Sequence, residues 1–307
     1  MKTYQVKQIN AFTSKPFSGN PAGVVLDARG LTELKMQAIA REINCSETAF
    51  ILPPTVSNAD LQIRWFTPAV EVPLCGHATI ASFHALAEEG LYGMKKTGTY
   101  HFRVQTKSGV LPIEVEKKFS GTIIDFELPL PQFHTVRALA PQVLNALGLK
   151  ATDLHPKLPI VRTNSLYIPV RKFITLRKLK PDYESLQRWS RTMKLLGVCV
   201  FTLDTIEESS AVHSRYFVPS AGIPEDPVTG STNGPLGVYL YNYVFGSGLD
   251  VPWLRLPDGR IEFIGEQGDL LNRKGRVKIR LRVHHGHAEH VSIAGEAVTL
   301  YHAELKL

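Results

Sequence analysis

An internal repeat is the feature of this sequence that most constrains its fold. The segment RWFTPAVEVPLC, residues 64–75, aligns without a gap with RYFVPSAGIPED, residues 215–226, at an offset of 151 residues. In both copies a hydrophobic stretch precedes the segment, and a glycine-bearing turn and a mostly apolar stretch follow it. Such a repeat predicts one structural module built twice. The identical pairs are Arg64 with Arg215, Phe66 with Phe217, Pro68 with Pro219 and Pro73 with Pro224.

Each half is expected to contain the same succession of strand, second strand, turn and helix. The two helices, at HATIASFHALAEEG and from about residue 231 to 246, are apolar on nearly all sides. A short helix of that kind belongs inside a domain, so we predict a strongly curved sheet around one buried helix in each half. The predicted strands lie at about 47–54 and 60–67 in the first copy and at 198–204 and 211–218 in the second.

The rest of the chain indicates where the halves divide. A helix at 32–44, with Thr32 as its N-cap, is expected to pack outside the first sheet. The polar, proline-containing stretch 129–135 is a linker candidate. More strands follow the second helix than symmetry requires, so the last one or two are expected to return to the first half. We therefore place the first domain at 1–128 plus about 294–307 and the second at 136–293.

Composition limits the classes of function. With 44% hydrophobic residues the chain can fill globular cores. Three widely spaced cysteines fit reduced thiols, and the first residues lack the apolar stretch of a secretory signal, so a cytoplasmic protein is expected. The net charge of +7 fits nucleic acid, an anionic metabolite or solubility alone, and the basic stretch 171–194 lacks the interleaved aromatic residues typical of nucleic-acid binding. We expect neither nucleic acid nor a membrane as a partner.

Three turns are candidate binding sites for an anionic group. CGHAT and DPVTGST stand at the two predicted helix starts, where backbone N–H groups have no partner within the helix. The loop FSGNPAGV adds glycines that permit close approach of a ligand to the backbone. These turns are expected to bind a small anionic metabolite through Asn20, Cys75, Gly76, Gly230 and Ser231.

Glu47 is the candidate acid/base. It stands in CSETAFI at the start of a hydrophobic strand, where partial desolvation would raise its pKa toward the range in which a carboxyl group both takes and returns a proton. His77, in the first helical turn, is a candidate donor to a substrate carboxylate or carbonyl. Cys75 and Asp226 occupy equivalent positions in the ungapped repeat, an arrangement that resembles the paired bases of cofactor-independent racemases.

A histidine-rich segment, VHHGHAEHV, is the feature that most suggests a metal. Its glycine and strand-like flanks predict a hairpin turn on which the side chains point in different directions, and no cysteine or aspartate stands at ligand spacing. We therefore expect no metal site, and no cofactor is expected either. The histidines are His284, His285, His287 and His290.

Four segments in order resemble the phenazine-biosynthesis PhzF-like isomerase family: FTSKPFSGNPAGVVL, INCSETAF, IRWFTPAVEVPLCGHATIA and SRYFVPSAGIPEDPVTGSTNGPLG. That family shares the diaminopimelate epimerase fold. The resemblance implies an α+β protein of two pseudo-symmetric domains, each a curved, barrel-like sheet around a central helix. It also implies a site between the domains and a homodimer.

The resemblance assigns roles to individual residues. In the characterised isomerase of the family, the glutamate that matches Glu47 shifts a proton on trans-2,3-dihydro-3-hydroxyanthranilate without a cofactor. Cys75 and the loop PVTGSTN differ from that enzyme, so the substrate of this chain stays open. An amino-acid racemase or epimerase that uses Cys75 with Asp226, and a non-catalytic binding protein that retains the fold, are the alternatives. Residues that line the substrate site of that isomerase match His77, Asp226, Gly230 and Ser231.

Overall fold

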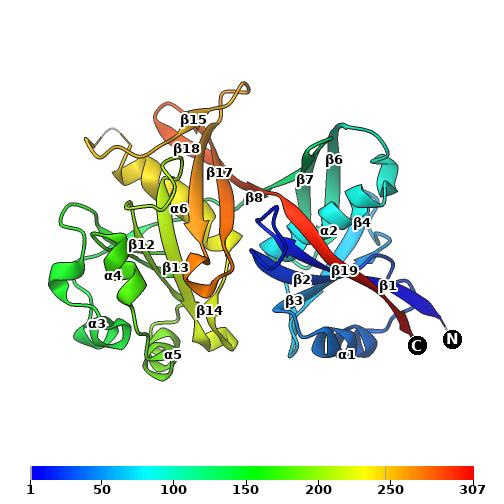
Figure 1. The fold of residues 1–307 in the computed structure, drawn as a ribbon, viewed down its shortest axis with the longest axis horizontal. Helices are drawn as coiled ribbons and strands as arrows, with labels where there is room; N and C mark the ends of the chain where they lie inside the picture. The colour runs from blue at the N-terminus through cyan, green and yellow to red at the C-terminus, as the bar shows by residue number, and fades with distance from the viewer. Residues whose placement is uncertain (1, 246) are drawn as a thin grey trace. The chain divides into compact units, whose positions relative to one another are not determined.

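The structure, a computed structural model, describes residues 2–245 and 247–307. The chain forms two compact units (Figure 1). Unit 1 comprises the residues up to Glu127 together with Ile293–Leu307, and unit 2 comprises Leu128–Ser292. The C-terminal strand lies in unit 1 because it pairs antiparallel with the N-terminal strand along its whole length, from Thr3 opposite Lys306 to Ala11 opposite Ala297.

Unit 1 is a mixed sheet whose strands are joined by both hairpins and crossovers. The second strand along the chain is parallel to the third, and the fourth is parallel to the sixth. The other neighbouring strands pair antiparallel. The spatial order is β19 (Ala297–Lys306), β1 (Thr3–Ala11), β2 (Asn20–Val25), β3 (Glu47–Leu52), β4 (Leu61–Phe66), β6 (Gly98–Thr106), β7 (Gly109–Lys118) and β8 (Gly121–Leu128), with the short β5 (Glu71–Val72) added to β4.

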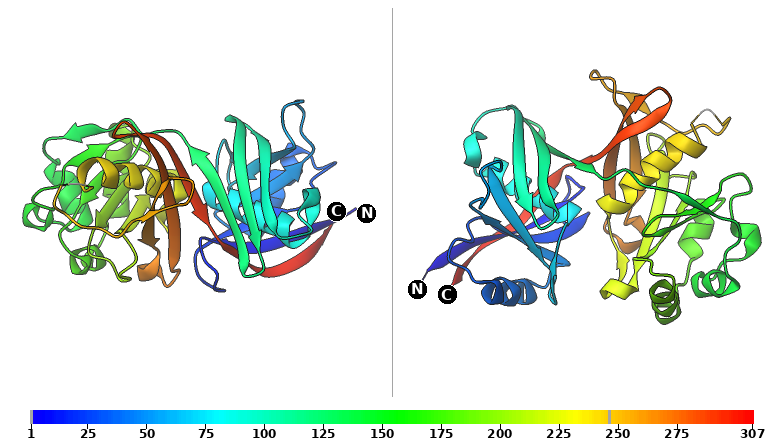
Figure 2. Two further views of the ribbon diagram at one scale, coloured as in Figure 1. Left: turned by 90° about the horizontal axis from the view of Figure 1, so that it is seen from above. Right: turned by 180° about the vertical axis from the view of Figure 1, so that it is seen from behind.

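A buried helix, α2 (Gly76–Glu88), lies inside the curve of this sheet and packs against β1, β2, β3 and β19 (Figures 1 and 2). Its residues are buried on nearly every side, as its all-round apolar sequence predicts. The sheet approaches the helix start closely, since a Cβ at Gly76 would lie 3.0 Å from Phe126 Cζ. On the outer face, α1 (Glu33–Ile43) buries Met36 and Ile39, and Thr32 accepts a capping hydrogen bond from Lys35 N at 3.3 Å.

Unit 2 repeats this strand order. Two of its neighbouring pairs are parallel, β11 with β12 and β13 with β16, and they match the parallel pairs of unit 1. The order is β9 (His134–Val136), β10 (Ile160–Arg162), β11 (Leu166–Pro169), β12 (Val198–Thr202), β13 (Val212–Val218), β16 (Ile261–Gln267) and β17 (Gly275–His284); β14 (Ile223–Asp226) pairs with β13, β15 (Leu254–Arg255) pairs with β16, and β18 (His287–Gly295) follows β17 after a turn.

The central helix of unit 2 is α6 (Gly230–Tyr243), which packs so closely on β17 that a Cβ at Gly237 would lie 2.2 Å from Ile279 Cγ2. The expected helix end at residue 246 lies outside the described residues. An outer layer of three helices, two of which lie in the basic stretch 171–194, covers the opposite side of the sheet with a separate apolar core. These helices are α3 (Pro141–Leu147), α4 (Phe173–Lys178) and α5 (Tyr183–Thr192).

The short helices are η1 (Leu91–Gly93), η2 (Ala151–Asp153), η3 (Pro219–Ala221) and η4 (Asp269–Leu271). Among the described residues no helix combines the length and the apolar character needed to cross a membrane.

An arginine–glutamate pair occurs in the same place in both units. Arg64 Nε and Nη2 donate to Glu71 over 2.7 Å each, and Arg215 Nε and Nη2 donate to Glu225 over 2.8 and 2.7 Å. Each guanidinium also lies over the phenylalanine two residues later. The arginines are 151 residues apart, but the glutamates are 154 apart, so the ungapped alignment missed this duplicated clamp.

The three extra residues lie in the turn that carries η3, and they correct one prediction. Trp65 pairs with Val72, and its counterpart Tyr216 pairs with Asp226. The two central helices begin 154 residues apart, after the N-cap residues Cys75 and Thr229. The prediction that Cys75 and Asp226 are equivalent is therefore wrong, because an insertion in the turn shifts the register before the helix start.

The clamp of unit 2 is nearly buried, with side chains of Arg215 and Glu225 only 10% and 7% exposed. We expect Arg215→Met to lower the free energy of unfolding by about 3–5 kcal/mol, because it leaves an uncompensated buried carboxylate. Arg215→Met combined with Glu225→Leu should cost less than Arg215→Met alone. Urea denaturation measures both differences.

The exposed pair Arg29–Asp27, with side chains 67% and 48% exposed, supplies the control. Arg29→Met should cost much less than Arg215→Met, because solvent screens an exposed ion pair. A double variant in the buried clamp that is as unstable as Arg215→Met would contradict this account.

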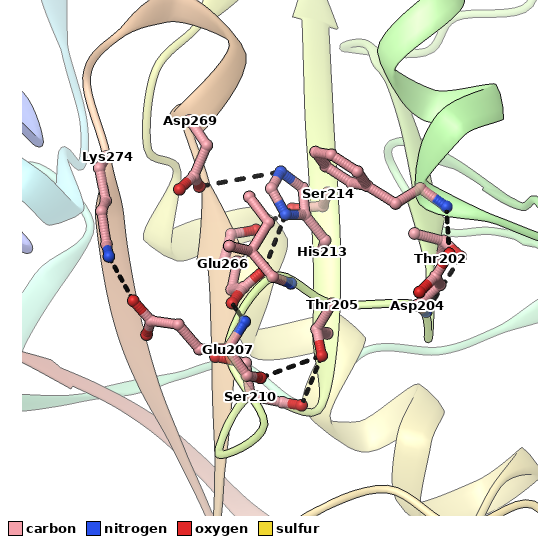
Figure 3. Close-up of polar contacts among 12 residues, drawn as sticks. Thr202, Asp204, Thr205, Glu207, Ser210, His213, Ser214, Glu266, Asp269 and Lys274 are labelled. Atoms are coloured by element: carbon pink, nitrogen blue, oxygen red, sulfur yellow. Dashed lines mark hydrogen bonds and ion pairs between the residues drawn. The ribbon is translucent and has the colours of Figure 1, made fainter.

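A buried ionic network surrounds Glu266 at the end of β16 (Figure 3). His213 Nδ1 lies 2.8 Å from Glu266 Oε2, and the backbone N–H groups of Ile206 and Glu207 donate to the carboxylate over 2.9 and 2.8 Å. Burial would raise the pKa of Glu266, but these hydrogen bonds and the charge of Arg276 lower it to about 2.

Unit 1 has an amide in the corresponding place. Gln105 pairs with Gln62 across β4 and β6, as Glu266 pairs with His213 across β13 and β16. Thr55 N donates to Gln105 Oε1 over 2.7 Å, so both units anchor the turn after their β3 or β12 strand through this position. Both units therefore use a side chain at this position to accept hydrogen bonds from the turn, and only unit 2 has a charged carboxylate there.

Because the pKa of Glu266 is below its ordinary value of 4.5, its contribution to stability is complete above about pH 5 and is lost as the pH falls toward about 2. The shift corresponds to a contribution on the order of 3 kcal/mol. We expect Glu266→Gln to lower the free energy of unfolding at neutral pH, and the difference from the native chain should shrink between about pH 5 and pH 2.

Urea denaturation at a series of pH values measures that difference. The exposed residue Glu208, changed to Gln, serves as the matched control. A difference for Glu266→Gln that does not vary with pH would show that the carboxylate charge contributes nothing.

Candidate active site

Three of the predicted site residues meet at the start of α2 in unit 1. Glu47 begins β3, Cys75 is the N-cap of α2, and His77 lies in its first turn. His77 Nε2 lies 3.2 Å from Glu47 Oε2, and Cys75 Sγ lies 3.5 Å from His77 Nδ1. The carboxylate oxygen, thiol and imidazole atoms all lie within 4.8 Å of one another. The tertiary structure thus joins two segments that are nearly 30 residues apart.

The strand pairing of β2 and β3 positions this cluster. Glu47 lies opposite Ala22 in parallel register, which brings the loop before β2 next to the residue that precedes Glu47. Ser46 Oγ lies 3.2 Å from His77 Nε2 and 3.4 Å from Asn20 Oδ1. Asn20 is fully buried behind Ser46, so its side chain supports the cluster through the serine hydroxyl.

Burial is the main influence on Glu47, whose side chain is 14% exposed. The pKa of Glu47 is raised because burial disfavours the charged carboxylate, and hydrogen bonds from Ser46 and Cys75 only partly oppose this. Among the described residues Glu47 has no lysine or arginine partner, and its buried Oε2 accepts no hydrogen bond of regular geometry. These features are typical of a carboxyl group that exchanges protons with a ligand rather than one that stabilises a fold.

Unit 2 has a polar cluster at the start of α6. Thr229 Oγ1 donates to Asp226 Oδ2, and Thr229 N donates to Gln267 Oε1 over 3.0 Å. Gln267 Nε2 donates to Asp226 O over 2.9 Å, and Asn233 Nδ2 donates to Gln267 Oε1 over 2.9 Å. Gln267 is 1% exposed and makes three of these contacts, and its Nε2 also donates to Thr229 Oγ1 over 3.2 Å. It therefore acts as the buried organiser of the turn that carries Asp226.

The predicted site residues fall into two groups. Glu47, Cys75, Gly76 and His77 come together in unit 1, with Asn20 one contact away. Asp226 and Gly230 flank the corresponding turn of unit 2, and Ser231 is exposed in the first turn of α6. Neither N-cap side chain, Cys75 or Thr229, caps its helix.

Sequence reasoning missed Ser46, Thr229 and Gln267 as contributors to these clusters. Ser46 could have been found, because it is adjacent to Glu47 in the CSETAFI segment. Thr229 was hidden by the three-residue insertion, and Gln267 gave no local signal because it reaches the cluster from β16.

The histidine-rich segment forms the turn between β17 and β18, as expected for a hairpin. His284 and His285 have ring centroids 3.9 Å apart, and His284 Nδ1 lies 3.2 Å from the exposed Glu289. Among the described residues these histidines are not part of any group of three potential metal ligands in close contact.

Comparison with known proteins shows the family to which the chain belongs. The model of the PhzC-PhzF family, described as phenazine biosynthesis-like protein, matches residues 9–303. The chain therefore belongs to this family.

Individual relatives are similar to this protein over the whole chain. A Clostridium acetobutylicum protein named as an uncharacterized isomerase is 37% identical over 100% of this chain and 99% of its own length. The crystal structure of the PhzF-family phenazine biosynthesis protein from Bacillus anthracis is 34% identical, covers 100% of both chains and has a TM-score of 0.86.

A hydroxyproline epimerase from Agrobacterium vitis is 12% identical and has a TM-score of 0.60 over 99% of this chain and 91% of that one, which shows a shared fold. The fold is thus the predicted α+β type of the diaminopimelate epimerases, with two pseudo-symmetric units.

The role of Gln267 can be measured. Gln267→Leu removes the acceptor of Thr229 N and of one Asn233 Nδ2 hydrogen bond, and the donor to Asp226 O, so we expect the free energy of unfolding to fall by about 2–4 kcal/mol. Amide hydrogen exchange should quicken in residues 227–233 more than elsewhere in the chain. The exposed residue Gln5, changed to Leu, is the control. Unchanged exchange in that segment would contradict the role of Gln267.

Proposed function

We propose that this protein is a cofactor-independent isomerase that moves a proton between carbon atoms of a small carboxylate-bearing substrate, with Glu47 as the general acid/base. The observation that carries the proposal is a buried carboxylate without a lysine or arginine partner, 3.2 Å from an imidazole at the start of a buried helix. Membership of the phenazine biosynthesis-like family supports it.

The chemistry requires a base that can also act as an acid. Glu47 takes a proton from a carbon made acidic by an adjacent carbonyl or unsaturated system, and returns it to another carbon on the same face. Carbon acids are weak, so the developing enolate needs several kcal/mol of stabilisation from oriented dipoles. The first-turn N–H groups of α2 and the imidazole of His77 are the groups that supply it in this proposal.

The substrate class follows from the same groups. An N-terminal helical turn favours a carboxylate, and the half-buried position of Glu47 favours a compact ligand. A compound resembling trans-2,3-dihydro-3-hydroxyanthranilate, the substrate of the characterised family isomerase, meets both requirements. The expected roles of Asp226, Gly230 and Ser231 stay predictions.

Cys75 favours one alternative, a thiol-dependent racemase, because its sulfur lies 3.5 Å from His77 Nδ1. The racemase alternative relied on Cys75 and Asp226 as equivalent positions of the repeat. The counterpart of Cys75 at the second helix start is instead Thr229, whose hydroxyl is a much weaker acid than a thiol. A single-face proton shift needs one base, whereas racemisation needs a second on the opposite face.

A substrate screen with a matched set of variants tests the proposal. Cyclic and unsaturated amino and hydroxy acids are incubated with the protein in deuterated water, and deuterium uptake at carbon is read by mass spectrometry. We expect Glu47→Gln to slow uptake by at least roughly 100-fold, the scale of general acid/base catalysis. Glu42→Gln, an exposed change nearby, should leave the rate unaltered.

Cys75→Ser separates the two mechanisms. It should leave measurable uptake in a Glu47 isomerase and stop uptake in a thiol racemase. Uptake that survives Glu47→Gln, or a complete screen in which no compound gains deuterium, would overturn the proposal. Asp226→Asn, assayed beside these variants, tests the expected role of Asp226 through separate effects on KM and kcat.

A further inference from the structure

Glu47, Cys75 and His77 form a donor set that suits a metal ion better than the histidine-rich hairpin does. They offer a carboxylate oxygen, a sulfur and an imidazole nitrogen within 4.8 Å of one another, and among the described residues no other group of three such side chains is as close. Thiolate and imidazole ligands select zinc and related transition metals over magnesium or calcium.

The distances fit a tetrahedral ion. Zinc bonds of about 2.3 Å to sulfur and about 2.0–2.2 Å to nitrogen and oxygen place neighbouring ligand atoms roughly 3.3–3.6 Å apart. His77 Nε2 lies 3.2 Å from Glu47 Oε2 and 4.0 Å from Cys75 Sγ. His77 Nε2 is the ring nitrogen in contact with the carboxylate, and an ion on this atom requires the Cys75 sulfur to move closer to it than 4.0 Å.

The surroundings supply further requirements of a metal site. The carboxylate of Glu47 has no lysine or arginine partner among the described residues, so a divalent cation would meet its charge without competition from a resident cation. Ser46 Oγ lies 3.2 Å from the same His77 Nε2 atom, so it holds the imidazole in place while the site is empty and would give way to a bound ion. Three protein ligands leave the fourth tetrahedral position open to water or to an anion.

We propose that this cluster binds zinc and similar thiophilic divalent cations reversibly, and that the bound ion inhibits the isomerase. Both functions need the same electrons: the lone pair with which Glu47 would take a proton from carbon is the lone pair that would bind the ion. Occupation by metal and proton transfer therefore exclude each other. The inhibitory part rests on the proposed function, whereas the binding part does not.

Cobalt is the direct probe, because Co²⁺ in a four-coordinate site with a thiolate ligand absorbs visible light. Titration of the full chain with CoCl₂ should give a saturable band with one ion per chain, and ZnCl₂ should remove it. Cys75→Ser and His77→Asn should each weaken binding by more than the roughly 10–100-fold that loss of an outer partner costs.

Two controls separate this site from other thiols and histidines. Cys199 is fully buried in unit 2, so Cys199→Ser should retain the band. His284→Asn with His285→Asn removes the exposed hairpin pair and should also retain it. Circular dichroism of every variant checks that the fold persists. A band that survives Cys75→Ser, or that disappears with the hairpin variant, overturns the assignment.

The activity arm uses the deuterium-uptake assay with added ZnCl₂ and a chelator. Uptake should fall with the same zinc dependence as displacement of cobalt, and the chelator should restore it. Zinc that fills the site and leaves uptake unaltered overturns the inhibitory role. If the Glu47→Gln variant retains uptake and the native chain binds cobalt, the isomerase proposal is wrong and the metal site stands. If the native chain does not bind cobalt and uptake depends on Glu47, only the metal site is wrong.

Discussion

The burial of one apolar helix inside each curved sheet is the constraint on which the rest of the structure depends. Helix α2 is enclosed on nearly every side, and each large apolar side chain that it buries contributes roughly 1.5–3 kcal/mol. The N–H groups of its first turn have no partner within the helix, so this end is where polar side chains of other segments can meet the helix. The location of Glu47, Cys75 and His77 is therefore a consequence of core packing.

The two units share the same strand order and the same anchoring contacts, but they differ in the side chains at the start of the central helix. Both units retain the arginine–glutamate clamp and the anchored turn. The three extra residues lie in a turn, where an insertion costs little. They alter which side chain becomes the helix N-cap, a thiol in Cys75 and a hydroxyl in Thr229, and so the two helix starts offer different donors and acids.

The charge of Glu47 is important for both of its proposed roles, as an acid/base and as a metal ligand. In the carboxylates of Glu71, Glu225 and Glu266, a cation or several N–H groups balance the charge. Glu47 lacks such a balance, so its charge favours neutralisation by a proton or by a metal ion. One local imbalance thus underlies both the isomerase proposal and the inhibitory metal site.

Local patterns in the sequence determined much of this protein. The repeat, the two all-round apolar helices and the position of Glu47 at the start of a strand could be predicted, because amphipathicity and helix caps act over a few residues. The outer helices of unit 2, the contact of Ser46 with His77 and the reach of Gln267 to Asp226 could not, since each depends on packing between distant segments. Tertiary structure alone decided that Thr229, and not Asp226, is the counterpart of Cys75, because strand pairing rather than residue count sets the register after an insertion.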